Sequence, residues 1–207
     1  MKIRVSVLAF VLVLLASAPC WAGTIEFADC SSVVGTPPAT CSGGATNLNS
    51  ITYTSGIVAT GYHWDGTWGY TPLAIKNGGL DETGLGVLID GDDEIGIHDA
   101  ISLDLSVLGN TGFWLNIESI QSGESYMYCF GPNAVTTCTP IATNVTNGSI
   151  YLTVDSSNPF LFISASSGNI LVTSITVPDQ VPEPSSMFLL GSGLFGLAGI
   201  VRRKISR

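Results

Sequence analysis

The sequence predicts a mainly β protein whose central part is an antiparallel β-sandwich of jelly-roll-like type. The first observation is the strict alternation of apolar and polar residues in Ile101–Val107, as expected for a strand with one buried face. The second is that short β-branched runs recur about every ten residues, separated by turn-forming Gly, Asn and Ser. The third is that Gly23–Val177 is rich in Thr, Ser, Gly, Ile and Val and contains no amphipathic helical pattern.

The expected strands follow one another along this region. Phe113–Glu118 repeats the alternation, with three apolar residues opposed by Trp114, Asn116 and Glu118. Phe160–Ala165 is apolar on both faces, so we expect it to lie at the centre of a sheet. The remaining predicted strands are Ile51–Thr54, Ile57–Thr60, Ser149–Val154 and Ile170–Val177.

Residues 1–22 have the layout of a secretory signal peptide. Two basic residues precede an apolar run from Val5 to Ala16, and small residues stand at positions −3 and −1 of a cleavage site after Ala22. This run of about 12 residues is shorter than the roughly 20 that span a bilayer, so we expect cleavage rather than a permanent anchor. Lipidation of Cys20 is the alternative, but Pro19 stands where a lipoprotein signal has a small residue.

The cysteines support the same cleavage. Removing residues 1–22 leaves four cysteines, an even number in a compartment where disulfides persist. We expect the pairs Cys30–Cys41 and Cys129–Cys138, because the members of each pair are close in sequence and lie in loops rich in Gly, Pro and Thr. A zinc site is the alternative, but the sequence has no CxxC pair and both histidines are distant.

The charge of the exported part is strongly negative. Between Gly23 and Pro184, Lys76 is the single basic residue against 16 acidic residues, a formal charge of −15. Such a surface repels nucleic acid, which proteins bind through Lys and Arg, and it attracts divalent cations. We therefore expect no nucleic-acid partner.

The C-terminal segment predicts a membrane helix. Residues 178–184 contain three prolines and form a linker that cannot continue a sheet. Met187–Val201 then carries no charge, and a basic cluster follows directly. As a helix this run is about 22 Å long, against a hydrocarbon core of about 30 Å. It spans the membrane if the helix begins at Ser185 and the basic residues snorkel to the cytoplasmic interface, so we expect a single transmembrane helix in residues 185–207.

This layout resembles the PEP-CTERM sorting signal. Its elements stand here as Val181, Pro182, Glu183 and Pro184, then a Gly-rich apolar run, then Arg202, Arg203 and Lys204. The resemblance implies recognition by an exosortase, a membrane-embedded enzyme of Gram-negative bacteria that make exopolysaccharide, with cleavage near Pro-Glu-Pro. The helix is then a transient inner-membrane anchor, and the exported protein ends at the cell surface or in the extracellular matrix. The alternative is a permanent anchor in which the prolines are a stiff spacer.

The ectodomain, residues 23–177, carries a further resemblance. Gly79–Val87, followed by Asp93–Ile95 and Ile101–Leu105, resembles an arrangement that recurs in PEP-CTERM ectodomains. Most of those domains lack a known activity, so this resemblance implies little about function.

An acidic segment, Leu88–Asp99, is a candidate calcium site. Calcium takes six to eight oxygen ligands, which Asp90, Asp92, Glu94 and Asp99 would supply in part. The segment is not an EF-hand loop, because isoleucine replaces both the glycine and the final glutamate that this loop requires. The alternative is a solvated acidic turn that blocks edge-to-edge aggregation.

An aromatic segment, Gly61–Tyr70, is a candidate sugar-binding site. The four aromatic residues Tyr62, Trp64, Trp68 and Tyr70 would stack on sugar rings, and His63 and Asp65 would bind hydroxyl groups. The alternative is that Trp64 and Trp68 are core or loop-packing residues, since large aromatic side chains dominate core burial.

These observations lead us to expect a non-enzymatic surface or matrix protein, associated with exopolysaccharide and biofilm. A calcium-assisted carbohydrate-binding module is the alternative. A hydrolase built on His98 is a third interpretation, but a nucleophile needs an adjacent base, and the sequence has only two histidines and no GxSxG motif.

Overall fold

A computed structural model of the chain describes residues 23–35, 44–79, 82–89, 93–133, 142–144 and 147–178. These residues lie in one compact unit, Trp21–Pro178. They form 14 β-strands and two short 3₁₀ helices, η1 (Cys30–Ser32) and η2 (Ser106–Leu108). The described part of the chain is therefore mainly β, as the sequence predicts.

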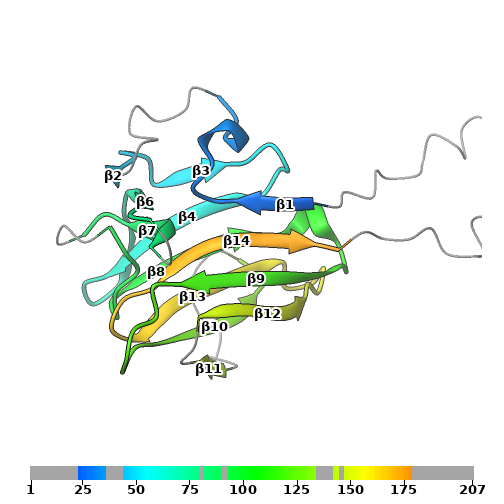
Figure 1. Cartoon of the computed structure of the whole chain (residues 1–207). Coiled ribbons are helices and arrows are strands. Elements are labelled where there is room, and N and C mark those ends of the chain that lie inside the picture. Colours follow the sequence, from blue (N-terminus) through cyan, green and yellow to red (C-terminus); the bar gives the residue numbers. More distant parts are fainter. Residues whose placement is uncertain are drawn as a thin grey trace, which may run out of the picture. The chain divides into compact units, whose positions relative to one another are not determined.

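The first of two antiparallel sheets, here sheet I, is built around β14. Its strand order is β12 (Gly148–Thr153), β9 (Gly112–Glu118), β14 (Leu171–Val177), β7 (Thr83–Val87), β6 (Leu73–Asn77) and β2 (Gly44–Ala45). The strand β1 (Gly23–Glu26) also pairs with β14, from Gly23 opposite Val177 to Glu26 opposite Ser174. Figure 1 shows β1, β14, β9 and β12 side by side in this order.

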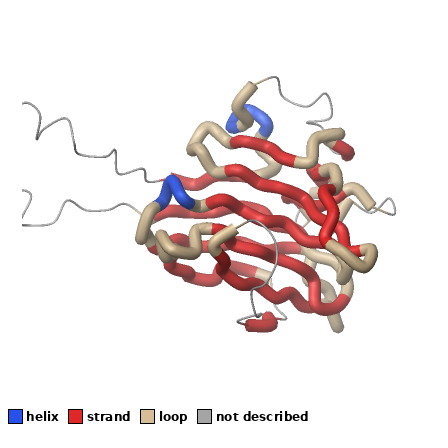
Figure 2. Tube along the Cα trace, turned by 180° about the vertical axis from the view of Figure 1, so that it is seen from behind, coloured by secondary structure: helices blue, strands red, loops and turns tan. Residues whose placement is uncertain are grey.

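The second sheet, sheet II, has β13 between two long neighbours. Its order is β11 (Ala142–Asn144), β10 (Ser125–Gly131), β13 (Phe160–Ser167), β8 (Asp99–Asp104), β4 (Val58–Trp64) and β3 (Ser50–Thr52). The short β5 (Trp68–Tyr70) pairs with β4. In Figure 2, seen from behind, the strands of both sheets account for most of the described trace. The prediction that Phe160–Ala165 is a central strand is confirmed.

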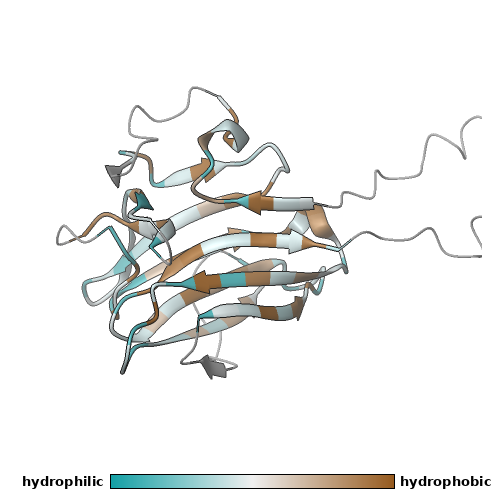
Figure 3. Cartoon of the chain, viewed as in Figure 1, coloured by the Kyte–Doolittle hydropathy of each residue, from teal (hydrophilic) through white to brown (hydrophobic). Residues whose placement is uncertain are grey.

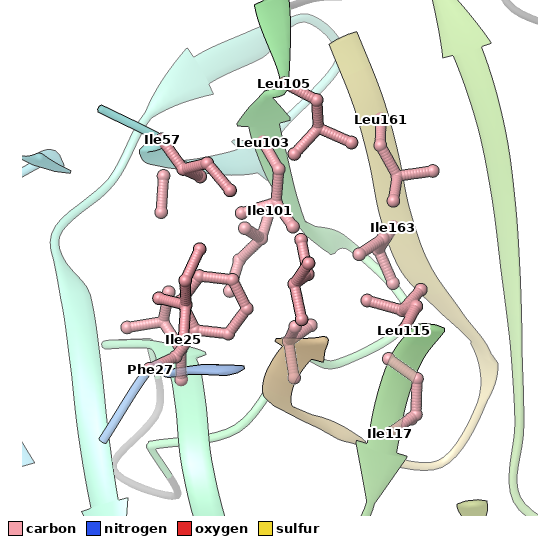
Figure 4. Packing of buried hydrophobic residues seen from close by; sticks show 14 of the residues in the cluster. Ile25, Phe27, Ile57, Ile101, Leu103, Leu105, Leu115, Ile117, Leu161 and Ile163 are labelled. Carbon is pink, nitrogen blue, oxygen red and sulfur yellow. The ribbon is translucent and has the colours of Figure 1, made fainter. Parts of the chain in front are cut away.

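The core lies between the two sheets. Leu115 and Ile117 of β9 belong to the same buried cluster as Leu161 and Ile163 of β13, and all four are fully buried (Figure 4). Alternation assigns the other side chains of each strand to an outer face. Figure 3 shows this alternation of hydrophobic and hydrophilic residues along β9 and β14. Two antiparallel sheets that share one core are the architecture of a β-sandwich.

One predicted strand is shorter than expected. The alternation predicts a strand over Ile101–Val107, but β8 ends at Asp104 and η2 begins at Ser106. The Asp104 Oδ1 atom accepts a hydrogen bond from the Ser106 backbone N–H at 3.0 Å, which starts the turn. A short polar side chain that binds the backbone two residues ahead favours a turn over a strand.

The predicted signal peptide and C-terminal helix lie outside the described residues and stay predictions. Within the described ranges, no helix is long and apolar enough to span a membrane.

Candidate functional site

The aromatic segment predicted from the sequence forms a β-hairpin of β4 and β5. Its turn is Asp65-Gly66-Thr67, in which Gly66 has a φ of 106°, a left-handed conformation that glycine adopts without strain. The register pairs Trp64 with Trp68 and Tyr62 with Tyr70. Directly paired residues point to the same face of a sheet, so these four rings lie together. Ala59 of β4 lies in the core, which assigns Tyr62 and Trp64 to the outer face of sheet II.

A fifth ring comes from β13 and extends this group. The Phe162 ring lies 5.1 Å from the Trp68 ring and 6.4 Å from the Tyr62 ring, centroid to centroid. Trp64 and Trp68 make an edge contact at 5.4 Å, and Tyr62 and Tyr70 lie 5.2 Å apart. We call these five residues the aromatic surface. Its rings are held by their neighbours at separations typical of favourable aromatic pairs.

The aromatic surface is open to solvent. Tyr70 is 69% exposed and Trp64 is 42% exposed, whereas Tyr62 beneath them is 2% exposed. Burial, followed by the neighbouring Tyr70, raises the pKa of Tyr62 well above its usual value, so this phenol stays protonated at physiological pH. Neither tryptophan lies in the buried cluster, so they are not core residues, but Trp64 packs against Trp68 and Trp68 packs against Phe162. Exposed aromatic groups of this kind mark binding surfaces for ligands or partners.

Asp65 lies in the turn beside these rings and is exposed. The structure therefore brings together Tyr62, Trp64, Asp65, Trp68 and Tyr70 of the predicted sugar site, because they belong to one local hairpin. It also adds Phe162, which sequence analysis did not assign. Only the sheet register, which brings β13 near β4, could have identified Phe162.

The two histidines have different environments. His63 Nδ1 lies 2.8 Å from Asp99 Oδ1, and the Gly96 N–H donates to Asp99 Oδ2 at 3.2 Å. His98 is an exposed turn residue whose backbone carbonyl accepts from the Trp64 N–H at 2.7 Å. Within the part of the chain that the structure describes, neither imidazole bonds to a Ser, Thr or Cys side chain.

The described carboxylates of the acidic segment contact different partners. Glu94 is 7% exposed, forms an ion pair with Lys76 Nζ and accepts from Ser119 Oγ at 3.0 Å. Asp99 is committed to His63, as described above. Asp90 and Asp92, the other two predicted calcium ligands, lie outside the described residues. Among the residues that are described, no group of three or more His, Cys, Asp or Glu side chains is arranged to hold a metal ion.

The cysteines are described only in part. Cys30 packs against the core at the start of η1, and Cys129 on β10 is 4% exposed. Both are disulfide-bonded. Cys41 and Cys138 fall outside the described residues, so the pairing stays a prediction. The sorting residues Val181 to Pro184 and Arg202 to Lys204 also lie outside that part.

Comparison with known proteins identifies the C-terminal segment. The family model of the PEP-CTERM protein-sorting motif matches residues 180–204, which contain every element of the predicted sorting signal. No curated protein and no solved structure matches the chain.

Proposed function

From the premise that this chain is a PEP-CTERM protein, we propose that it is an exported surface or extracellular-matrix protein of a Gram-negative bacterium. The motif at residues 180–204 is the observation that carries this proposal. It indicates export, sorting to the cell surface and an exosortase as the processing partner. The apolar helix after the motif holds the precursor in the inner membrane until cleavage, and exopolysaccharide surrounds the released domain.

The exported domain acts in this proposal as a jelly-roll-like, non-enzymatic module. Strands β7 to β14 are arranged as β7-β14-β9-β12 in sheet I and β8-β13-β10-β11 in sheet II, which supports a jelly roll of eight strands. A non-enzymatic role is supported by the aromatic surface, which offers area for stacking, while the adjacent His63 and Asp99 bond to each other.

Replacing Glu183 tests the sorting step. We expect Glu183→Ala, or Pro182→Ala combined with Pro184→Ala, to leave a full-length precursor in the membrane fraction, because the enzyme no longer recognises its cleavage region. The measurement is an immunoblot of membrane and extracellular fractions from an exosortase-containing host. Asp179→Ala is the matched control, since it removes an acidic residue just before the matched segment and should be processed normally. Normal processing and release of Glu183→Ala would show the proposal to be wrong.

A second candidate function is carbohydrate binding, which the aromatic surface favours. Exposed rings from a rigid hairpin present flat apolar area, and Asp65 beside them offers a hydrogen-bond acceptor for sugar hydroxyls. Of the four predicted calcium ligands, Glu94 already contacts Lys76 and Ser119, and Asp99 already contacts His63.

Replacing the two tryptophans tests this second candidate. We expect Trp64→Ala combined with Trp68→Ala to weaken binding about tenfold to the polysaccharide that retards the wild type, since each aromatic contact contributes about 0.5–1.5 kcal/mol. The measurement is affinity electrophoresis of the full chain, in a polyoxyethylene detergent, through gels containing hydroxyethylcellulose, xylan, dextran or pullulan. Leu48→Ala is the control, because Leu48 is 42% exposed, as Trp64 is, and lies outside the aromatic surface. Unchanged retardation of the double variant would argue against the candidate.

A further inference from the structure

The outer face of sheet I carries a row of polar side chains that crosses four strands. The register places Glu26 of β1 opposite Ser174 of β14, Ser174 opposite Asn116 of β9, and Asn116 opposite Ser149 of β12. Asn116 Nδ2 donates to Ser174 Oγ at 2.7 Å, and Ser149 Oγ donates to Asn116 Oδ1. The amide of Asn116 is thus fixed by its neighbours and presents a defined pattern of hydrogen-bonding groups. We call these four residues the polar row.

A cavity of about 400 Å³ opens at the polar row. All four members line it, together with Glu118, Asn147 and Thr173. The Thr173 Oγ1 atom is buried and has no hydrogen-bond partner among the described residues. A buried hydroxyl without a partner costs free energy unless a ligand or water satisfies it. The volume lies in the range of small-ligand pockets, about 300–1,000 Å³.

An aromatic pair flanks the cavity on the same face. Trp114 and Tyr151 are directly paired between β9 and β12, two residues along from Asn116 and Ser149. Alternation therefore places this pair beside the polar row, about 7 Å along the strands. The two rings make an edge contact at 5.1 Å, and the side chains are 42% and 51% exposed.

Gly112 allows Tyr151 to take this position. A Cβ atom added at Gly112 would lie 1.9 Å from the Tyr151 hydroxyl oxygen and 2.4 Å from its Cζ atom. The ring of Tyr151 therefore lies over the backbone of β9, beside Trp114, in space that any other residue at position 112 would occupy. A substitution at Gly112 can displace this ring without removing an aromatic residue.

The charge of this face selects the class of ligand. Glu26 and Glu118 are the charged residues that line the cavity. Burial, followed by the charge of Asp29, raises the pKa of Glu26. The single basic residue of the exported part, Lys76, is paired with Glu94 and Glu82. Anionic ligands are therefore disfavoured, whereas uncharged polyhydroxylated ligands can bond to the amide, carboxyl and hydroxyl groups.

We propose that this face, formed by the polar row, its cavity and the Trp114–Tyr151 pair, is a glycan-binding surface for neutral polysaccharide. It rests on the proposed function of the exported domain and adds a second surface to the aromatic surface of sheet II. Two packed sheets separate the outer faces, so they bind different stretches of glycan. The domain is thus bivalent and links polysaccharide chains, a role in which two weak sites bind through avidity.

Aggregation of polysaccharide-coated beads tests this inference. The full chain, in the same detergent, is mixed with beads that carry whichever of the four polysaccharides retards it most. We expect the wild type to aggregate the beads. Trp114→Ala with Tyr151→Ala, and separately Trp64→Ala with Trp68→Ala, should each still bind single beads but lose aggregation, and the quadruple variant should lose binding. Gly112→Ala should weaken aggregation through the displaced Tyr151 ring, and Leu48→Ala should leave it unchanged.

The other outcomes overturn the inference in distinguishable ways. If the Trp64 and Trp68 replacements abolish all binding while those at Trp114 and Tyr151 change nothing, sheet II binds glycan alone and the second surface is wrong. If Trp114 and Tyr151 can be replaced without loss of aggregation, bivalency through sheet I is wrong. If no polysaccharide retards the wild type, both glycan surfaces are wrong, whereas the sorting of the chain, tested through Glu183, is unaffected.

Discussion

Replacing Lys76 with methionine is expected to lower the free energy of unfolding by about 3 kcal/mol, because it removes the positive partner of a buried carboxylate. Lys76 lies on β6 and pairs with Glu94, whose side chain is 9% exposed. Without the ammonium, the Glu94 carboxylate loses its positive partner, although Ser119 Oγ still donates a hydrogen bond to it at 3.0 Å. Methionine preserves most of the apolar stem, so the loss reports the charge rather than the packing. Urea unfolding, followed by tryptophan fluorescence, measures the change.

Two matched variants distinguish the stability contribution of the buried Lys76–Glu94 ion pair from that of an exposed ion pair. Glu82 also lies near Lys76, at 3.3 Å, but its side chain is 43% exposed, so we expect Glu82→Gln to cost less than about 1 kcal/mol. Adding Glu94→Gln to Lys76→Met removes the negative charge of the buried Glu94 carboxylate and should restore part of the stability. A loss for Lys76→Met as small as that for Glu82→Gln would contradict this account.

The pH dependence provides an independent check of the same pair. Burial alone would lower the pKa of Lys76, but the hydrogen bonds and charges of Glu94 and Glu82 outweigh it and raise this pKa above its usual value. A pKa that is higher in the folded state stabilises the protein below the unfolded pKa of about 10.5, and this contribution is lost as the pH rises through the folded value. The stabilities of the wild type and Lys76→Met should therefore converge at strongly alkaline pH.

Most of the strands that sequence analysis found have one buried face, whereas Phe160–Ala165 was found as a run that is apolar on both faces. Phe113–Glu118 and Ser149–Val154 show clear alternation or β-branched runs, and the structure places β9 and β12 there. The strand β10 was missed because Tyr126 to Phe130 are consecutive aromatic or apolar residues with no period of two. The strand β7 was missed because glycines, Gly84 and Gly86, stand at the positions where polar side chains would have alternated with the apolar ones.

The two candidate surfaces differ in how far apart their residues lie in the sequence. The sugar-binding residues Trp64 to Tyr70 were predictable because one hairpin of ten residues contains them all. The second surface was not, since Glu26, Asn116 and Ser174 are far apart in the sequence and only the pairing of β1, β14 and β9 brings them together. The sequence of the acidic segment shows neither the burial of Glu94 nor its ion pair with Lys76, which is 18 residues away.

Replacing Gly86 with alanine is the second change for which we expect a large effect, a loss of at least about 3 kcal/mol in the free energy of unfolding. Gly86 is buried in β7, and a Cβ atom there would lie 2.1 Å from the backbone oxygen of Asp93. It would also lie 2.8 Å from the Glu94 Cα atom. Because these neighbours are backbone atoms, no side-chain rotation relieves the clash, and the segment must move. Thermal and urea unfolding measure the loss.

This movement links Gly86 to the buried ion pair. The segment Asp93–Ile95 is held by the Ile95 N–H, which donates to the Ile170 carbonyl at 2.9 Å. Displacing this segment therefore strains its hydrogen bonds to Ile170 and withdraws Glu94 from Lys76. We therefore expect the effects of Gly86→Ala and Lys76→Met to be less than additive, because the first already weakens the contact that the second removes. Gly69→Ala is the matched control, since an added Cβ there meets nothing within 4 Å and should change the stability by less than about 0.5 kcal/mol. Full additivity would mean that the glycine acts only through local packing and that the ion pair survives the displacement.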